Sequence, residues 1–359
     1  MYRTLLLPAL DVAAGFGLDA ESAHDLTLHA LAGWKHGHDA ARNWLLGDKP
    51  AATELLGLHF DHPIGLAAGL DKHARALPAW WGLGFAFAEL GTVTPLPQPG
   101  NPQPRMFRLT AQEAIINRMG FPSDGLAAVV ERLRAPRTTP LVIGVNVGKN
   151  KATADEDAEQ DYVQCIAACR DHADYLVINV SSPNTPGLRA LQAPDRIERL
   201  VARCVATATT AAGRTVPVLL KVAPDFGVGA LEETILAAMQ GGVAGIVASN
   251  TTLDRNGVPE KWQHEAGGLS GVPLRHKATE TVRRVRRVTQ GRLPIMGVGG
   301  VASAEDAWDK IRAGADLVQL YSALVLRGPA VVGDIAGGLA ELQARDGFAH
   351  WRDAVGVDA

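Results

Sequence analysis

Cysteine is scarce in this chain, with three residues among 359. Cys165, Cys169 and Cys204 are too few and too poorly spaced for a disulfide framework. A Cys-x3-Cys pair on a helix also lacks the further ligands that a zinc ion needs. We therefore expect buried thiols in a reducing compartment and no metal site.

Long apolar runs and an excess of one charge are missing as well. No window holds the roughly 18 consecutive apolar residues of a membrane-spanning helix. The run from Leu5 to Leu10 is interrupted by Pro8 and ended by Asp11, so it is too short for a signal-peptide core. The net charge of −3 argues against a protein that neutralises phosphate backbones, and we expect no nucleic-acid partner.

A Gly-x-Gly-x-x-Gly turn, typical of dinucleotide-binding open sheets, does not open the first helical segment. Instead, short apolar runs alternate with segments of helical periodicity. The eight runs span residues 64–69, 86–94, 141–148, 175–183, 216–224, 245–252, 293–300 and 317–324. Continuous apolarity indicates parallel strands with both faces buried.

Amphipathic segments follow several of these runs, as expected for strand and helix units. They span residues 157–172, 195–212, 231–240, 274–288 and 303–313. Eight such units favour a closed (β/α)8 TIM barrel of the α/β class, with a small N-terminal helical extension. An open, doubly wound sheet is the weaker alternative.

Polar residues gather where the apolar runs end. The richest stretch is NVSSPNTPGL, residues 179–188, which directly follows the run YLVI. The C-terminal ends of barrel strands meet at one mouth, where TIM-barrel enzymes carry their chemistry. The other strand-end residues are Asp71, Lys72, Thr92, Asn146, Lys149, Lys221, Asn250 and Thr251. They predict one ring of functional groups.

A glycine-rich turn after the seventh run predicts a phosphate site. Gly297, Gly299 and Gly300, with Tyr321 and Ser322 at the eighth run, stand where barrels commonly bind phosphate through backbone N–H groups. Tight turns also need glycine, so the GVGG motif alone is weak evidence for phosphate binding. Its position after the seventh of eight units is the stronger evidence.

Nearly all of residues 60–325 resembles the dihydroorotate dehydrogenases, and within them the class 2, quinone-dependent, membrane-associated enzymes. The longest shared motifs are AAGLDK (67–72), GTVTPLPQPGNPQPRMFRL (91–109), INRMGF (116–121), GVNVGKN (144–150), NVSSPNTPGLR (179–189), LLKVAPD (219–225), SNTTLDR (249–255), GGLSG (267–271), GVGG (297–300) and LVQLYS (317–322). The resemblance implies oxidation of (S)-dihydroorotate to orotate in de novo pyrimidine (UMP) biosynthesis.

The resemblance also implies FMN, one per chain, as cofactor. The implied FMN residues are Ala68, Gly69, Thr92, Asn146, Asn179, Lys221, Ser249, Gly271, Gly300, Tyr321 and Ser322. Lys221 has a physical reason to be among them, because a cation beside the flavin stabilises the negative charge that develops on reduction. A lysine inside an apolar strand is otherwise costly.

The implied orotate pocket combines one lysine with several amides, which suits a carboxylate and two imide-like edges. Its residues are Lys72, Asn117, Arg118, Met119, Gly120, Phe121, Asn179, Asn184, Asn250 and Thr251. Ser182 corresponds to the family's catalytic base and Thr185 to its proton relay, with Phe121 screening the site. Classes with soluble acceptors carry cysteine where this chain has Ser182, which favours class 2.

Residues 3–14 and 19–34 read as two short helices, and we expect residues 1–45 to form an extension and residues 46–359 the catalytic barrel. The helices could simply plug the barrel bottom. In the resembling family they form a quinone tunnel at the membrane surface, for ubiquinone or menaquinone. His24, Arg108 and Tyr321 correspond to its quinone contacts.

The resemblance suggests a monomer bound peripherally to the cytoplasmic face of a bacterial inner membrane. Two functional alternatives stay open: a related enzyme that uses fumarate or NAD, and a flavin-binding barrel without turnover that serves as sensor or scaffold. Residues 256–266 match no motif, and we expect a mobile loop over the substrate.

Overall fold

Eight parallel strands close into a barrel at the centre of the computed structural model, which describes residues 19–359 except 48, 186 and 228. Around the barrel the strands follow the order β10-β12-β13-β3-β4-β7-β8-β9. Their bounds are β3 Ile64–Leu66, β4 Phe87–Val93, β7 Val142–Val147, β8 Tyr175–Asn179, β9 Val218–Val222, β10 Gly245–Ala248, β12 Ile295–Val298 and β13 Leu317–Leu320. Each falls in one of the eight predicted runs, so the TIM-barrel prediction is confirmed.

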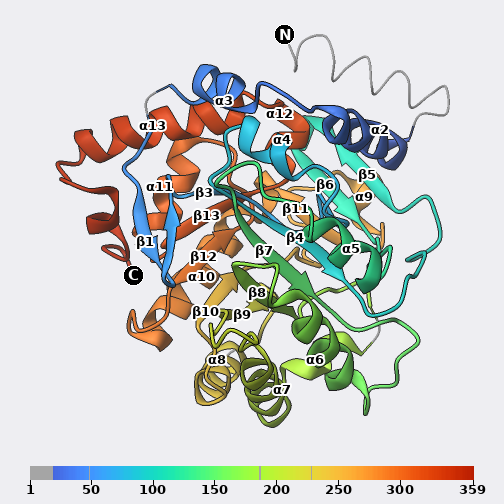
Figure 1. Cartoon of the computed structure of the whole chain (residues 1–359). Coiled ribbons are helices and arrows are strands. Elements are labelled where there is room, and N and C mark those ends of the chain that lie inside the picture. The colour runs from blue at the N-terminus through green and yellow to red at the C-terminus, as the bar shows by residue number, and fades with distance from the viewer. Residues whose placement is uncertain (1–18, 48, 186, 228) are drawn as a thin grey trace.

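Helices cover the outside of the barrel (Figure 1). They are α4 Leu77–Gly82, α5 Leu126–Leu133, α6 Ala158–Cys169, α7 Pro194–Thr207, α8 Ala230–Gln240, α10 Arg275–Thr289, α11 Ala304–Arg312, α12 Ser322–Arg327 and α13 Val331–Arg345. The five predicted amphipathic segments correspond to α6, α7, α8, α10 and α11. Helix α7 ends before its predicted limit, because residues 208–216 turn back through a Thr209–Thr215 bridge.

The barrel interior explains the continuous apolarity of the runs. All residues of β4, β7, β8 and β9 are buried, since one face packs inside the barrel and the other lies under the helices. The three cysteines are buried in this core, where burial raises the pKa of each thiol, as expected for inert structural residues.

Two small antiparallel sheets were not predicted. One is the hairpin of β1 (Thr53–Leu55) and β2 (Leu58–Phe60). The other has the order β11-β6-β5, formed by β5 (Met106–Leu109), β6 (Ala114–Asn117) and β11 (Gly268–Gly271). We call this second sheet the mouth sheet, because two of its strands carry residues that line the cavity described below.

The predicted helix 19–34 is present as α2 (Ala20–Gly33), capped by the Asp19 side chain. It contacts β5 of the mouth sheet and α4, and Figure 1 shows it at the edge of the barrel beside these elements. The next helix, α3 (His38–Leu46), packs on α4 and α13. The predicted helix 3–14 lies outside the described residues. Within the part of the chain that is described, no helix has both the length and the apolarity needed to span a bilayer.

The 256–266 segment contains a short helix, α9 (Glu260–Gln263). The Trp262 ring contacts Phe107 of the mouth sheet at 5.5 Å between centroids, and Arg255 donates hydrogen bonds to the carbonyls of Glu265 and Gly267. The segment is therefore packed against the mouth sheet in this structure. That it moves over a substrate stays a prediction.

Candidate active site

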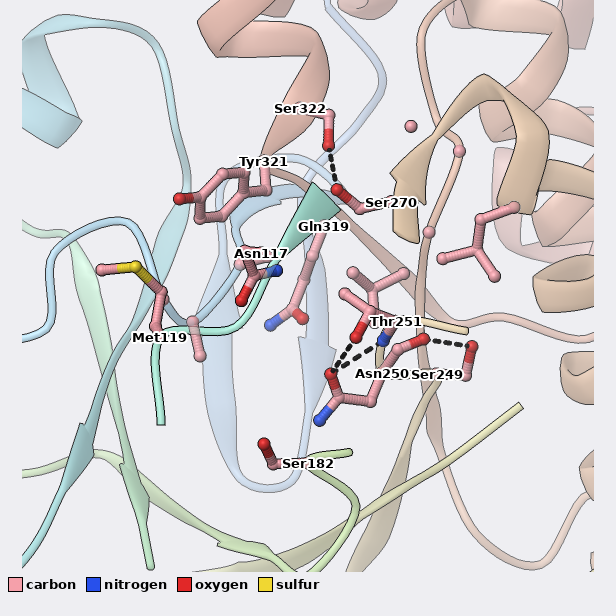
Figure 2. A pocket seen from close by; sticks show the side chains of 18 of the residues that line it. Asn117, Met119, Ser182, Ser249, Asn250, Thr251, Ser270, Gln319, Tyr321 and Ser322 are labelled. Atoms are coloured by element: carbon pink, nitrogen blue, oxygen red, sulfur yellow. Dashed lines mark hydrogen bonds between the residues drawn. The ribbon is translucent and has the colours of Figure 1, made fainter. Parts of the chain in front are cut away.

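A cavity lies at the C-terminal ends of the barrel strands, between the barrel and the mouth sheet. It brings together most of the residues singled out from the sequence. Those that line it are Ala68, Gly69, Lys72, Thr92, Asn117, Met119, Gly120, Phe121, Asn179, Ser182, Asn184, Lys221, Ser249, Asn250, Thr251, Gly271, Gly300, Tyr321 and Ser322. Figure 2 shows several of their side chains around this space, including Ser182, Asn250 and Tyr321.

Three amide and hydroxyl side chains form a buried hydrogen-bonded cluster at the ends of β4, β7 and β8. Thr92 donates to Asn146 Oδ1 at 2.6 Å, and Asn179 Nδ2 donates to both Thr92 Oγ1 at 3.0 Å and Asn146 Oδ1 at 3.1 Å. Asn146 does not line the cavity. It lies behind Thr92 and Asn179 and fixes their orientation.

A second chain of bonds joins β8 to β10. Asn250 Nδ2 donates to Ser181 Oγ at 2.9 Å, and Ser181 Oγ donates to Asn179 Oδ1 at 3.0 Å. The side-chain oxygen Oδ1 of Asn250 in turn accepts from the Thr251 backbone N–H at 2.7 Å. Neutral donors and acceptors with fixed directions thus surround the cavity, which suits a planar ligand with amide-like edges.

Ser182 and Thr185 lie on the loop after β8 and are 5% and 6% exposed. Ser182 Oγ accepts from the Asn184 backbone N–H at 3.2 Å, and Asn184 Nδ2 reaches the Asn117 carbonyl of the mouth sheet at 3.1 Å. Thr185 does not line the cavity, and its buried Oγ1 has no hydrogen-bond partner among the described residues. A buried hydroxyl with spare bonding capacity, three residues after Ser182 on the same loop, can receive or pass on a proton.

The loop carrying Phe121 closes one side of the cavity. Phe121 and Gly120 adopt positive φ angles of 57° and 68°. A Cβ on Gly148 would lie 2.7 Å from Thr92 Cγ2 and 3.1 Å from the Phe121 ring, so this glycine lets both side chains approach the β7 end. Met119 belongs to the same loop and also lines the cavity.

Arg118 is the predicted pocket residue whose side chain the structure does not place at the cavity. It forms an ion pair with Glu265 and donates to the Pro104 carbonyl at 2.7 Å. Its guanidinium also lies 4.8 Å from the centre of the Phe107 ring. Arg118 therefore holds the 256–266 segment against the mouth sheet.

Lys72 donates to the Gly69 carbonyl at 2.6 Å at the rim nearest α2. Burial lowers the pKa of Lys72 to about 8, while Glu21 and Asp25 of α2 act in the opposite direction. His24, which also lies on α2, is close enough to Lys72 for the ammonium charge to affect the pKa of the imidazole. Burial first, and Lys72 second, lower the pKa of His24 to about 3.

Helix α2 is therefore next to the barrel mouth, and the idea that it plugs the barrel bottom is wrong for this helix. A buried ion pair fixes it there: Arg105 donates to both Glu21 oxygens, with its shortest bond at 2.6 Å. Tyr321 lies between α2 and the cavity in an apolar cluster with Met106 and Met119 that also contacts Ala20. Arg108 lies on β5, the strand that α2 contacts.

Several residues of this region were missed from the sequence. Ser270 of β11 shares a hydrogen bond with Ser322 at 2.9 Å between their hydroxyl oxygens, visible in Figure 2. Arg189 connects the loops after β8, β9 and β10 through the Ser181 carbonyl at 3.1 Å, Asp225 at 3.2 Å and the Thr251 carbonyl. Glu89 of β4 and Gln319 of β13 were also missed from the sequence. A charged residue inside the apolar run AFAELGTVT was a visible signal for Glu89, by the argument that identified Lys221.

Comparisons with known proteins agree with this geometry. The sequence profile of a family described as dihydroorotate dehydrogenase matches residues 50–342. A relative from Deinococcus deserti named dihydroorotate dehydrogenase (quinone) is 48% identical over 370 residues, covering 100% of both chains. A relative of the same name from Anaeromyxobacter dehalogenans is 50% identical, covering 99% of this chain and 97% of its own. The ligand-free DHODH structure from Eimeria tenella superimposes with a TM-score of 0.86 at 36% identity, covering 95% of this chain and 99% of that one.

Proposed function

The chain belongs to the dihydroorotate dehydrogenase family, and we propose that it oxidises (S)-dihydroorotate to orotate through a bound flavin and delivers the electrons to a quinone. This reaction belongs to pyrimidine biosynthesis. The observation that carries the proposal is that Lys72, Ser182 and Lys221 line one cavity at the C-terminal mouth of the barrel.

We propose FMN, one per chain, as the flavin. The cavity fits it, because the backbone of Gly271 and Gly300 and the hydroxyl of Ser322 line one side, and amide and lysine side chains line the other. Gln319 also lines the cavity, and the bond from its Nε2 to the Glu89 carboxylate at 2.8 Å fixes its side chain there. When bound there, FMN supplies the hydride acceptor.

The protein's own residues bind and deprotonate the substrate. Lys72 pairs with the dihydroorotate carboxylate, and the amides of Asn117, Asn179 and Asn250 fix its ring edges. Ser182 removes the proton from C5 while the hydride leaves C6, and Thr185 passes the proton onward. Phe121 keeps water from this side of the cavity.

We propose that the quinone, ubiquinone or menaquinone, reaches the flavin past α2, near His24, Arg108 and Tyr321. His24 is neutral above a pH of about 3, so it presents a polar but uncharged ring to an apolar ligand. Leu26 of α2 and Trp44 of α3 are 64% and 83% exposed, which supports peripheral binding to a membrane surface. We further propose a monomer at the cytoplasmic face of a bacterial inner membrane.

An anaerobic experiment tests the function directly. Dihydroorotate is mixed with the purified protein while flavin absorbance is followed, and a quinone analogue is then added. Bleaching followed by recovery is expected. Recovery with fumarate or NAD but not quinone would assign another acceptor, and a flavin that never bleaches would favour the barrel without turnover.

A further inference from the structure

Glu89 is a carboxylate in the interior of the barrel, with an exposed fraction of 0%. It lies in the middle of β4, whose other residues are apolar or small apart from Thr92 at the mouth. Burying a carboxylate costs free energy unless it is paired and hydrogen-bonded. Its partners therefore indicate why the chain keeps a charge there.

Those partners come from three other strands. Glu89 Oε1 accepts from Asn146 Nδ2 of β7 at 2.7 Å and from Lys221 Nζ of β9 at 3.2 Å. Glu89 Oε2 accepts from Gln319 Nε2 of β13 at 2.8 Å. One carboxylate thus ties four of the eight barrel strands together.

Each of these contacts leads to the cavity. Lys221 and Gln319 line it, while Asn146 bonds to Thr92 and Asn179, which also line it. Glu89 itself does not line the cavity. Its carboxylate therefore lies directly behind the polar floor of the site and acts only through its neighbours.

We propose that Glu89 is a positioning residue for the flavin reaction: its carboxylate holds the Lys221 ammonium in place beside the cavity. The inference rests on the proposed function. Lys221 is only 5% exposed, so without a counter-charge its ammonium would be buried alone, which is strongly unfavourable. It would then turn away from this position, and the positive charge beside the flavin would be lost.

Glu89→Gln tests this, because it keeps the shape of the side chain and removes the charge. Sulfite adds reversibly to oxidised flavins and leaves negative charge on the ring, so its affinity reports the positive charge nearby. The variant is expected to bind sulfite at least tenfold more weakly than the parent protein. Its two-electron flavin potential should fall by about 30 mV or more, which is tenfold in that equilibrium.

Asp316→Asn is the matched control, since Asp316 is 5% exposed and lies at the opposite end of the barrel, where it accepts from the Ile295 N–H. It should match the parent protein in both measurements. In a Lys221→Met background, Glu89→Gln should produce no further change, because Glu89 acts through Lys221. If Glu89→Gln does not accumulate with flavin, Glu89→Asp takes its place, with weaker sulfite binding again expected.

Unchanged or tighter sulfite binding, or an unchanged or higher potential, would overturn the inference, because the Lys221 ammonium would then keep its place without Glu89. An effect that persists in the Lys221→Met background would overturn it too. A parent protein that carries flavin and is bleached by dihydroorotate separates these results from a failure of the proposed function itself.

Discussion

At the N-terminal ends of the barrel strands, acidic side chains bond to the backbone of a neighbouring strand. Asp174, just before β8, accepts from the Ile143 N–H of β7 at 2.8 Å, and Asp316, just before β13, accepts from the Ile295 N–H of β12 at 2.9 Å. At the C-terminal ends, polar side chains instead bond mainly to one another, as Asn179 does with Thr92 and Asn146.

The two ends also differ in what their polar side chains face. The carboxylates at the N-terminal end connect adjacent strands and so stabilise the barrel. At the mouth, Thr92 and Asn179 bond to each other and also line the cavity. Polar side chains that converge on a cavity mark the end that binds ligands. Substitutions at the two ends should therefore have separable effects.

The largest effect is expected at Ser182. Ser182→Ala removes the proposed base, so flavin reduction by dihydroorotate should slow by about 10²- to 10⁴-fold, the usual contribution of general base catalysis. Stopped-flow absorbance measures this step and flavin reoxidation by a quinone analogue separately. Reoxidation should be unchanged, and equal slowing of both steps would contradict the role of Ser182.

A smaller effect is expected where α2 joins the mouth. Glu21→Gln breaks the buried pair with Arg105, whose two side chains are 11% and 10% exposed. Loss of one partner of a buried pair is destabilising, so the helix should dock less well and KM for the quinone should rise by roughly tenfold or more. Flavin reduction by dihydroorotate should be nearly unchanged. Glu232→Gln, which weakens the more exposed pair with Arg284, is the control and should alter neither step.

The pH dependence of substrate binding should be moderate. Lys72 is charged below its pKa of about 8, so dihydroorotate should bind most tightly there and more weakly as the pH rises. One pH unit above that value, affinity should be about tenfold lower. His24 and His73, with pKa values lowered to about 3 and about 4, stay neutral throughout this range. Orotate titrations from pH 7 to 9.5 measure the change, and Lys72→Arg should remove it. A flat profile in the parent protein would exclude Lys72 as the carboxylate partner.

The smallest effect on catalysis is expected at the N-terminal end. Asp174→Ala leaves the Ile143 N–H without its acceptor and removes the ion pair with Arg137, so the free energy of unfolding should fall by about 1–3 kcal/mol. Urea denaturation measures this loss. Both half-reactions should keep their rates, and a slower flavin step would show that the two ends are not separable.

The barrel could be predicted from the sequence because each of its strands is marked by a pattern of neighbouring residues. Each strand appears as one apolar run, and the residues at its end reach the mouth whatever the order of the strands. The mouth sheet was missed because β5, β6 and β11 are four residues each, and β11 lies about 150 positions from its partner β6. Such short antiparallel pairings leave little periodicity to detect.

For individual site residues too, contacts between distant parts of the chain could not be predicted. Lys72, Ser182 and Asn250 follow strands and could be placed at the mouth from the sequence. The orientation of Arg118 toward Glu265 could not, because it depends on a contact 147 positions away. The role of Glu89 depends on which side chains of β7, β9 and β13 meet it inside the barrel, which no local pattern contains.

The mouth sheet has a consequence for engineering. Its three strands carry Arg108 beside the proposed quinone path, and Asn117 and Gly271, which line the cavity at the proposed substrate and phosphate positions. A designer who alters β5 to accept a different oxidant, or selects there for resistance to a compound that blocks quinone entry, should therefore disturb all three proposed sites. Helix α2 contacts this sheet through β5 but is not one of its strands. Exchanging α2 should therefore disturb Asn117 and Gly271 less than altering β5 would.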